Sequence, residues 1–424
     1  MLRVIDARGV TDLGALLPRP DEAALPLHAV REILREVRRD GDAAVRALTA
    51  RFDGVDIETA RVPQSHLPAA LDGLAPDLRE ALETAADRIR RFSRRQRPAD
   101  VTHDEDGIRI QERFVPLDRA GLYVPGGKAA YPSTVLMTAL PAQAAGVTDL
   151  VMCTPPGPDG SVPQVVLAAA ALVGIREVHA IGGAQAIAAM AYGTESVRPV
   201  DAIAGPGNLF VTLAKREVSA VVKIPAAFAG PSEVVVVADD TVDPELAAID
   251  LIVQAEHGPH GFAWLVTWSE TVAEAVNRHV TTLSAASPRR AEIEATLQEN
   301  GYVVLVEDAA QAIAVANVVA PEHLQLMVAD ADALSRDVRH AGAVFCGPWS
   351  PASLGDYAAG PSHVLPVART ARFGSVLSAE DFGKRMHVVR ASEEGLCKLA
   401  PTVQRIARAE GLAAHEASIA LRRR

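Results

Sequence analysis

The chain has 424 residues, which is too long for one small core and suits about two to four domains. Hydrophobic residues make up 49% and charged residues 22%, as in a water-soluble globular protein. The net charge of −11 argues against nucleic acid as a partner, because phosphate contacts need basic surfaces, and 4% aromatic residues leave no evident platform for stacking bases.

The three cysteines, Cys153, Cys346 and Cys397, are odd in number and far apart. This usage indicates a reducing compartment rather than disulfides or a thiolate zinc site. The first residues contain no apolar secretion signal, and the longest apolar run, residues 165–173, is about half a membrane span. We therefore expect a cytoplasmic protein with no membrane partner.

Residues 27–97 carry apolar side chains at helical spacing, and Gly41 is expected to end the first helix. Residues 109–115 alternate loosely between apolar and polar side chains, which favours a strand. At the other end of the chain, residues 347–379 read as a loop-rich segment and residues 400–421 as one final helix.

From residue 119 onward, short apolar strands alternate with alanine-rich helices. The expected strands are 121–124, 149–153, 177–181 and 201–204, followed by 233–237, 262–267, 302–306 and 343–346. Alternation of this kind predicts parallel sheets covered by helices on both faces, with ligands beyond the carboxyl ends of the strands.

The predicted fold class is α/β, with two parallel-sheet, incomplete Rossmann-like domains from a duplication and small, mainly helical segments at both ends. The expected division is 1–118 (an N-terminal helical region, partly an accessory domain), 119–232 and 233–347 (the two α/β domains) and 348–424 (a C-terminal loop and helix region).

Gln254 and His257 lie three residues apart at the end of an expected helix, so their side chains share one face. An amide oxygen and an imidazole in this arrangement are suitable zinc ligands. On spacing alone, a histidine that caps the helix end is the favoured interpretation, because two ligands are too few for a metal site.

Glycine-rich loops at 123–128, 182–185 and 205–208 each join a strand to a helix. The first backbone N–H groups of such helices can face an anion. None of the loops matches a dinucleotide or P-loop fingerprint, and glycine turns are also ordinary packing devices. The loops therefore leave a nucleotide or phosphate ligand and a purely structural role equally open.

Glu322 and His323 are adjacent and follow an expected helix. Such side chains are the usual proton-transfer groups near neutral pH. Adjacent helical residues point in different directions, so the pair needs a turn to converge, and a surface Glu beside a capping His is the favoured alternative. Possible ligands further along, each also an ordinary turn or surface residue, are Asp356, His363, Glu410 and His415.

Eight short motifs, which include the glycine loops and the candidate residues above, follow one another between residues 121 and 415. They are 121–127, 182–187, 205–208, 230–234, 254–257, 321–324, 355–357 and 410–412 with His415. In their order and spacing they resemble the histidinol dehydrogenases. The resemblance implies oxidation of an amino alcohol, L-histidinol, through L-histidinal to L-histidine, with two NAD⁺ per substrate molecule and one Zn²⁺ per subunit.

The resemblance also implies residue roles. The implied zinc ligands are Gln254, His257, Asp356 and His415. His323 is the implied general base, and Glu322 activates the water that adds to the aldehyde. Contacts to the substrate are implied for Ser232, His363 and Glu410, besides His323 and the four zinc ligands. NAD contacts are implied for Tyr123, Gln185 and Asn208.

These roles put NAD on the first α/β domain and the metal and catalytic pair on the second. The resemblance further implies a homodimer with shared active sites, in which the region 348–424 completes the site of the partner subunit.

Residues 222–229, Val-Lys-Ile-Pro-Ala-Ala-Phe-Ala, depart from the family pattern of an acidic residue and a Met-Pro-Ala run shortly before Ser232. A second hypothesis is therefore a related NAD-dependent dehydrogenase of another polar amino or sulfonated alcohol. A third is a two-lobed binding protein without activity, which the Glu322–His323 pair disfavours because binding alone needs no base.

Overall fold

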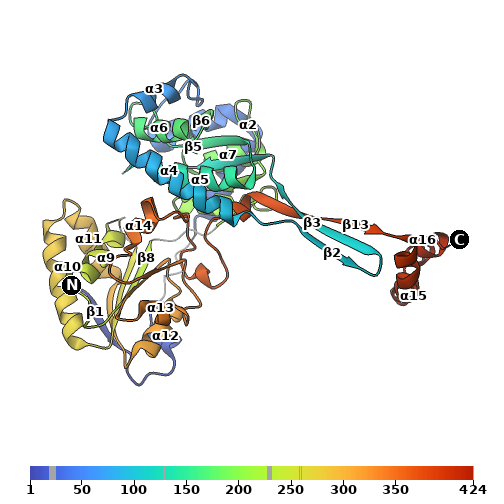
Figure 1. Ribbon diagram of the computed structural model, residues 1–424. Coiled ribbons are helices and arrows are strands. Elements are labelled where there is room, and N and C mark those ends of the chain that lie inside the picture. The colour runs from blue at the N-terminus through green and yellow to red at the C-terminus, as the bar shows by residue number, and fades with distance from the viewer. Residues whose placement is uncertain (19–24, 128, 227–231, 257, 259, 424) are drawn as a thin grey trace.

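The computed structural model describes residues 1–18, 25–127, 129–226, 232–256, 258 and 260–423. It contains two bodies, each built on a parallel sheet, and a ribbon of strands that projects away from both (Figure 1). The predicted α/β class with two parallel sheets is confirmed.

The first sheet has four parallel strands in the order β6-β5-β4-β7. Its strands are β4 (Arg119–Tyr123), β5 (Asp149–Thr154), β6 (Glu177–Ala180) and β7 (Ala202–Ala204). Its helices are α5 (Pro132–Ala145), α6 (Gln164–Leu172), α7 (Gly183–Tyr192) and α8 (Leu209–Val218). Three N-terminal helices, α2 (Leu27–Asp53), α3 (His66–Asp72) and α4 (Pro76–Gln96), pack against α7, α6 and α5 respectively.

The second sheet has six parallel strands in the order β1-β10-β9-β8-β11-β12. The strands are β1 (Arg3–Asp6), β8 (Glu233–Ala238), β9 (Phe262–Thr267), β10 (Gly301–Leu305), β11 (His323–Met327) and β12 (Ala343–Cys346). The helices are α1 (Leu13–Leu16), α9 (Pro244–Ala255), α10 (Glu270–Ala286), α11 (Arg290–Asn300), α12 (Ala309–Val319), α13 (Ala331–Ser335) and α14 (Ala352–Tyr357).

Alternate side chains of β8 enter two separate cores. Val235 and Val237 pack in one cluster, and Val234 and Val236 pack in the other. Both faces of the second sheet are therefore covered, which explains why its strands read as continuous apolar runs in the sequence.

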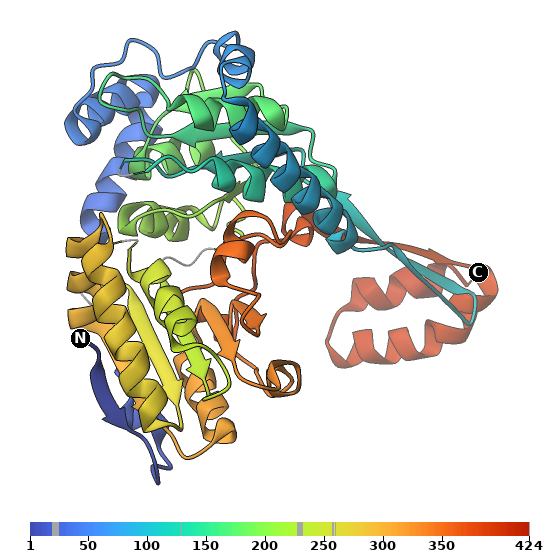
Figure 2. The same ribbon diagram turned by 60° about the vertical axis from the view of Figure 1, so that its left-hand side comes forward.

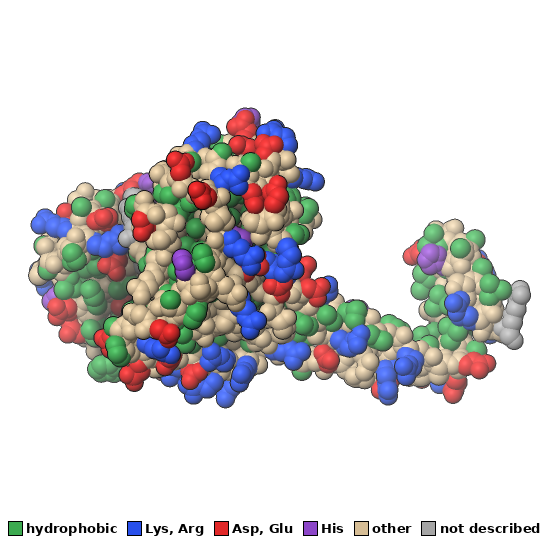
Figure 3. Space-filling model, turned by 90° about the horizontal axis from the view of Figure 1, so that it is seen from above, with side chains coloured by type: hydrophobic (Ala, Val, Ile, Leu, Met, Phe, Trp, Pro, Cys, Tyr) green, Lys and Arg blue, Asp and Glu red, His purple; other side chains and the backbone are tan. Residues whose placement is uncertain are grey.

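The third sheet is an antiparallel ribbon in the order β13-β3-β2. Its strands are β2 (Val101–Glu105), β3 (Ile108–Pro116) and β13 (Gly383–Ala391). The ribbon carries α15 (Glu393–Ala409) and α16 (Ala413–Leu421) at its tip, well away from both bodies (Figures 2 and 3). We call β2, β3, β13, α15 and α16 the arm.

Several local expectations were wrong. Gly41 does not end its helix: it kinks α2 with a φ of 54°, and the absent side chain leaves room for the Glu195 carboxylate. The expected final helix is two helices, broken at Gly411, which has a positive φ of 73°. Residues 3–6 and 323–327 form strands that the sequence patterns did not predict.

The division at residues 118, 232 and 347 stays a prediction. Elements from residues 1–118 contribute a strand to the second sheet, helices around the first sheet and two strands to the arm. Within the described ranges, none of the helices has the length and apolar character needed to cross a membrane.

A buried ion cluster joins the amino ends of three strands in the first sheet. The Arg119 guanidinium, 5% exposed, pairs with Asp149 and Glu177, and Glu177 also lies 3.1 Å from His179. We expect Arg119→Ala to lower the free energy of unfolding by about 3 kcal/mol or more, because two carboxylates lose their buried cation. Urea unfolding followed by circular dichroism measures the loss.

The matched control is Arg31→Ala, which breaks the solvent-exposed Arg31–Glu217 pair. This change should cost less than about 1 kcal/mol, because water screens an exposed pair. Equal small losses in the two variants would contradict the structural importance of the buried cluster.

Candidate active site

Glu322 and His323 lie at the amino end of β11, which pairs with β8 so that His323 stands beside Val234. The expectation that the pair follows a helix was right, but it continues into a buried strand. Ala320 ends α12 with a φ of 49°, and this left-handed turn redirects the chain just before Glu322. Both side chains are thereby buried, with 8% of Glu322 and 3% of His323 exposed.

The backbone of Glu233, the first residue of β8, contacts both members of the pair. Its N–H donates to Glu322 Oε2 at 3.2 Å, and its carbonyl oxygen lies 3.4 Å from His323 Nδ1. Glu322 Oε2 is 3.6 Å from His323 Nδ1, and Asp356 Oδ1 is 3.4 Å from His323 Nε2. The imidazole therefore lies between two carboxylates.

Burial sets the proton affinities of these groups. It raises the pKa of Glu322, and together with the charge of Glu322 it raises the pKa of Glu233 to about 8. Burial alone would lower the pKa of His323, but the carboxylates of Glu322 and Asp356 outweigh it and raise that pKa. Groups whose pKa values are shifted toward neutrality in this way suit general acid–base chemistry.

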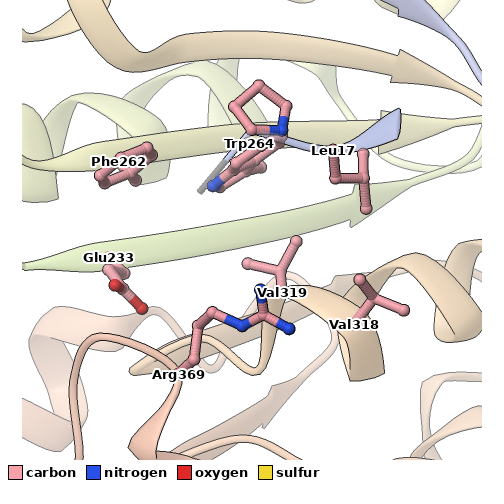
Figure 4. Close-up of a pocket in the computed structure, with 8 residues that line it drawn as sticks. Leu17, Glu233, Phe262, Trp264, Val318, Val319 and Arg369 are labelled. Carbon is pink, nitrogen blue, oxygen red and sulfur yellow. The ribbon is translucent and has the colours of Figure 1, made fainter. Parts of the chain in front are cut away.

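The Glu233 side chain points into a narrow cavity that Arg369 and Trp264 also line (Figure 4). Its Oε1 accepts a hydrogen bond from the Ala368 N–H at 3.0 Å, while Oε2 has no hydrogen-bond partner among the described residues. The cavity holds about 20 Å³, room for roughly one water molecule, so it is not a substrate site.

Two of the expected metal ligands lie on neighbouring elements of the second body. Gln254, near the end of α9, is 2% exposed, and its Nε2 has no partner in the described part of the chain. Asp356 lies in α14. Burial and the charges of Asp356 and Glu256 raise the pKa of its neighbour Tyr357. Glu256 caps the end of α9, so α14 lies close to the end of α9. His257 lies outside the described residues.

His415 and Glu410 are exposed on the arm, and the described residues of one chain do not gather three acidic, His or Cys side chains into a metal site. The amide oxygen, imidazole and carboxylate groups of these residues are of the types that bind zinc. In a single chain Gln254 and Asp356 therefore belong to helices of the second body, whereas His415 belongs to α16 at the tip of the arm. Figure 2 shows the two C-terminal helices away from both bodies.

His363 connects the two bodies. Its Nδ1 lies 3.0 Å from the Asp356 carbonyl oxygen, and its Nε2 lies 3.2 Å from Thr134 Oγ1 in α5. Ser362 beside it donates to the Met137 carbonyl oxygen at 3.0 Å. These bonds hold the segment that carries Asp356 against the first body.

Tyr123, Gln185 and Asn208 line one cavity of about 810 Å³ at the carboxyl edge of the first sheet. The Tyr123 hydroxyl accepts a hydrogen bond from the Gly183 N–H at 3.1 Å, and the Asn208 side chain caps α8 by accepting from Val211 N–H at 3.1 Å. The volume is in the range of cofactor sites. The three residues that the sequence singled out for a nucleotide are thus brought together.

Gly205 shows why one of the glycine loops needs glycine. Its φ is 114°, and a Cβ at this position would meet the Tyr123 carbonyl oxygen at 2.0 Å. The loop therefore packs against β4 in a way that no other residue permits.

The two sheets present opposite edges to these residues. Tyr123 ends a strand of the first sheet, and Gln185 and Asn208 follow two others, as expected. Ser232 and Glu322 instead precede strands of the second sheet, and His323 begins one. The candidate residues of the second body therefore lie at the amino ends of its strands, and the expectation that ligands lie beyond carboxyl strand ends stays a prediction there.

Sequence reasoning missed two acids, the buried Glu233 and the partly buried Asp53. The signal for Glu233 was available, because it is a charged residue that opens a fully buried strand. Asp53 is the last residue of α2, where it lines the 810 Å³ cavity.

Comparison with known proteins agrees with the implied family. The histidinol dehydrogenase family model matches residues 19–423. A histidinol dehydrogenase of Gluconobacter oxydans is 48% identical over 93% of this chain and 92% of its own. One of Moorella thermoacetica is 47% identical over the full length of both chains. The crystal structure of histidinol dehydrogenase from Elizabethkingia anophelis has a TM-score of 0.95 and 32% identity, and it covers 99% of this chain and 98% of its own.

The family model matches almost the whole chain, and the relatives have nearly half of their sequence in common with it. The chain therefore belongs to the histidinol dehydrogenase family, a family of oxidoreductases.

Proposed function

We propose that the protein is a zinc-dependent dehydrogenase that oxidises L-histidinol through L-histidinal to L-histidine with two NAD⁺. The observation that carries the proposal is the buried imidazole of His323, which lies between the carboxylates of Glu322 and Asp356. A binding protein needs no such pair, whereas removal of a hydroxyl proton needs a positioned base.

His323 is the base in this proposal. In this proposal the neutral imidazole carries its proton on Nδ1, and this N–H donates a hydrogen bond to the Glu233 carbonyl oxygen. Nε2 is then free of a proton and accepts the proton of the substrate hydroxyl. The carboxylates of Glu322 and Asp356 then stabilise the imidazolium. NAD⁺ supplies the hydride acceptor in each half-reaction.

Glu322 serves the second half-reaction. The Glu233 N–H fixes one carboxylate oxygen, and burial raises the pKa of Glu322, which makes the carboxylate a stronger base. We assign to it the proton of the water that adds to the aldehyde. The buried position of the pair also limits the escape of a reactive aldehyde into solvent.

The remaining roles complete the proposal. Zinc would be held by Gln254, His257, Asp356 and His415, and it would supply a Lewis acid that orients the substrate nitrogens. Ser232, His363 and Glu410 would contact the substrate, and Tyr123, Gln185 and Asn208 would contact NAD in the 810 Å³ cavity.

The arm is the basis of the proposed homodimer. Its helix α15 exposes Leu399, Val403 and Ile406 to solvent, by 44%, 38% and 55% respectively. Apolar side chains gathered on a projecting helix favour burial against another chain. A second subunit that receives the arm would also receive Glu410 and His415.

The yield of NADH tests the reaction itself. With zinc-loaded enzyme and limiting L-histidinol, we expect two NADH per substrate molecule, because alcohol and aldehyde oxidation each reduce one NAD⁺. Residues 222–226 lead toward Ser232 and differ from the family pattern, which keeps a related polar alcohol as the second candidate. Turnover of other amino or sulfonated alcohols, with none of histidinol, would favour that candidate.

Glu322→Gln separates the two half-reactions. We expect oxidation of supplied L-histidinal to fall by about 100-fold or more, and oxidation of the alcohol to fall much less, because only the aldehyde step needs an activated water. Single-turnover NADH formation from each substrate measures the two rates. Equal losses would contradict the role assigned to Glu322.

The matched variant is His323→Asn, which should slow both half-reactions and keep the zinc content unchanged. Zinc measured by atomic absorption provides this control. Loss of zinc from His323→Asn would show that His323 is itself a ligand.

Subunit mixing tests the shared site. His415→Ala and Gln254→Ala subunits should each be inactive, whereas their heterodimer should recover about one intact site. This follows because one site of the heterodimer combines the unaltered Gln254 and the unaltered His415. Zinc bound per dimer should rise together with activity, since ligand completion and binding share one free energy. Verified heterodimers without recovery would show that each chain builds its own site.

A further inference from the structure

The cavity at the carboxyl edge of the first sheet contains a carboxylate that the proposed mechanism does not use. Asp53, the last residue of α2, lines the same cavity as Tyr123 and Gln185. Its Oδ1 lies over Gly182, where a Cβ would be 3.3 Å from that oxygen. Asp53 therefore stands beside the amino end of α7, inside the proposed coenzyme site.

Asp53 lacks donors for part of its carboxylate. Its Oδ2 is buried and receives no hydrogen bond from the residues that the structure describes. Burial also raises the pKa of this carboxyl group. A buried carboxylate oxygen without a donor is costly, so a ligand that brings hydroxyl donors is the natural complement.

The rest of the cavity wall is uncharged. Among the described lining residues, Asp53 is the sole charged side chain, and the others are glycine, proline, alanine and further apolar or neutral polar residues. The C-terminal end of α2 adds negative potential at the same place. The amino end of α7 adds positive potential nearby, so an anion is disfavoured only in direct contact with the Asp53 carboxylate, where a neutral donor is favoured.

The position of the cavity indicates which end of a dinucleotide it receives. Its described lining comes from residues 33–210 and includes neither Glu322 nor His323. The nicotinamide has to reach those two residues, so the adenosine end is the part left in this cavity. On that end, the two neighbouring ribose hydroxyls match the two acceptor oxygens of a carboxylate.

We propose that Asp53 accepts hydrogen bonds from the 2′- and 3′-hydroxyls of the adenosine ribose and thereby selects NAD over NADP. This inference rests on the proposed NAD-linked function. In NADP a 2′-phosphate takes the place of the 2′-hydroxyl, so a negative charge would stand beside a partly buried carboxylate instead of a hydrogen-bond donor. The described lining residues include no Lys or Arg that could neutralise this charge.

Direct binding of coenzyme fragments tests the role of Asp53 without reliance on turnover. Calorimetry on the zinc-loaded enzyme would compare ADP-ribose with its 2′-phosphate. Asp53→Asn should raise the Kd of ADP-ribose roughly 10- to 100-fold, as expected for hydrogen bonds to a charged group, and should leave binding of the 2′-phosphate equal or stronger. In steady state the KM for NAD⁺ should rise while kcat changes little.

The matched control is Asp56→Asn, because Asp56 is exposed and does not line the cavity. In this variant the Kd values of ADP-ribose and of its 2′-phosphate should equal those of the wild type. If Asp53→Asn bound ADP-ribose and its 2′-phosphate with the same Kd values as the wild type, the proposal would be overturned. Inosine diphosphate ribose is a further probe. If wild type binds it as weakly as Asp53→Asn binds ADP-ribose, Asp53 reads the adenine amino group, and the ribose assignment is wrong.

Gln185→Ala distinguishes failure of this inference from failure of the proposed function. If Gln185→Ala weakens ADP-ribose binding and Asp53→Asn does not, the coenzyme site stands and the assignment of Asp53 falls. If neither substitution alters binding, the cavity is not the coenzyme site, and both proposals fail there.

Discussion

One backbone position, Glu233, contacts both Glu322 and His323, the proposed catalytic pair, through its N–H and its carbonyl oxygen. These contacts exist because β8 and β11 pair in parallel with His323 beside Val234. A slip of one residue would turn His323 to the other face of the sheet, so the strand register decides whether the site forms. Burial without such partners would favour the neutral forms of the carboxylate and the imidazole.

The candidate residues of the two bodies lie at opposite strand edges, and the two edges differ in charge. Glycine turns after strands of the first sheet leave a wide, nearly uncharged cavity. The amino edge of the second sheet instead gathers Glu233, Glu322 and His323, whose charges perturb one another. His363 bonds to Thr134 and to the Asp356 backbone, so the two edges are tied together beside the reacting groups.

Most strands could be predicted from the sequence because strands buried on both faces are continuous apolar runs, as in β8. β11 could not be predicted in this way, because its first and third residues, His323 and Gln325, are polar and yet buried. Their burial depends on the packing of the whole fold rather than on the local sequence. The same holds for the 3.4 Å approach of Asp356 to His323, which depends on the packing of α14 rather than on spacing. Family motifs pointed to these residues, but they could not show which sheet edge each residue occupies.

The arm favours association with another subunit in a way that the two bodies do not. It exposes apolar side chains of α15, and its helix α16 carries His415, whereas Gln254 and Asp356 of the same chain belong to helices of the second body. Burial of apolar surface favours association, so exposed apolar side chains on the arm favour a second subunit that covers them. If that subunit also uses His415 as a ligand, every ligand that binds the completed site adds to association by mass action. In that case assembly becomes a condition for the proposed activity, because Glu322 and His323 are brought together within one chain whereas the proposed zinc ligands are not.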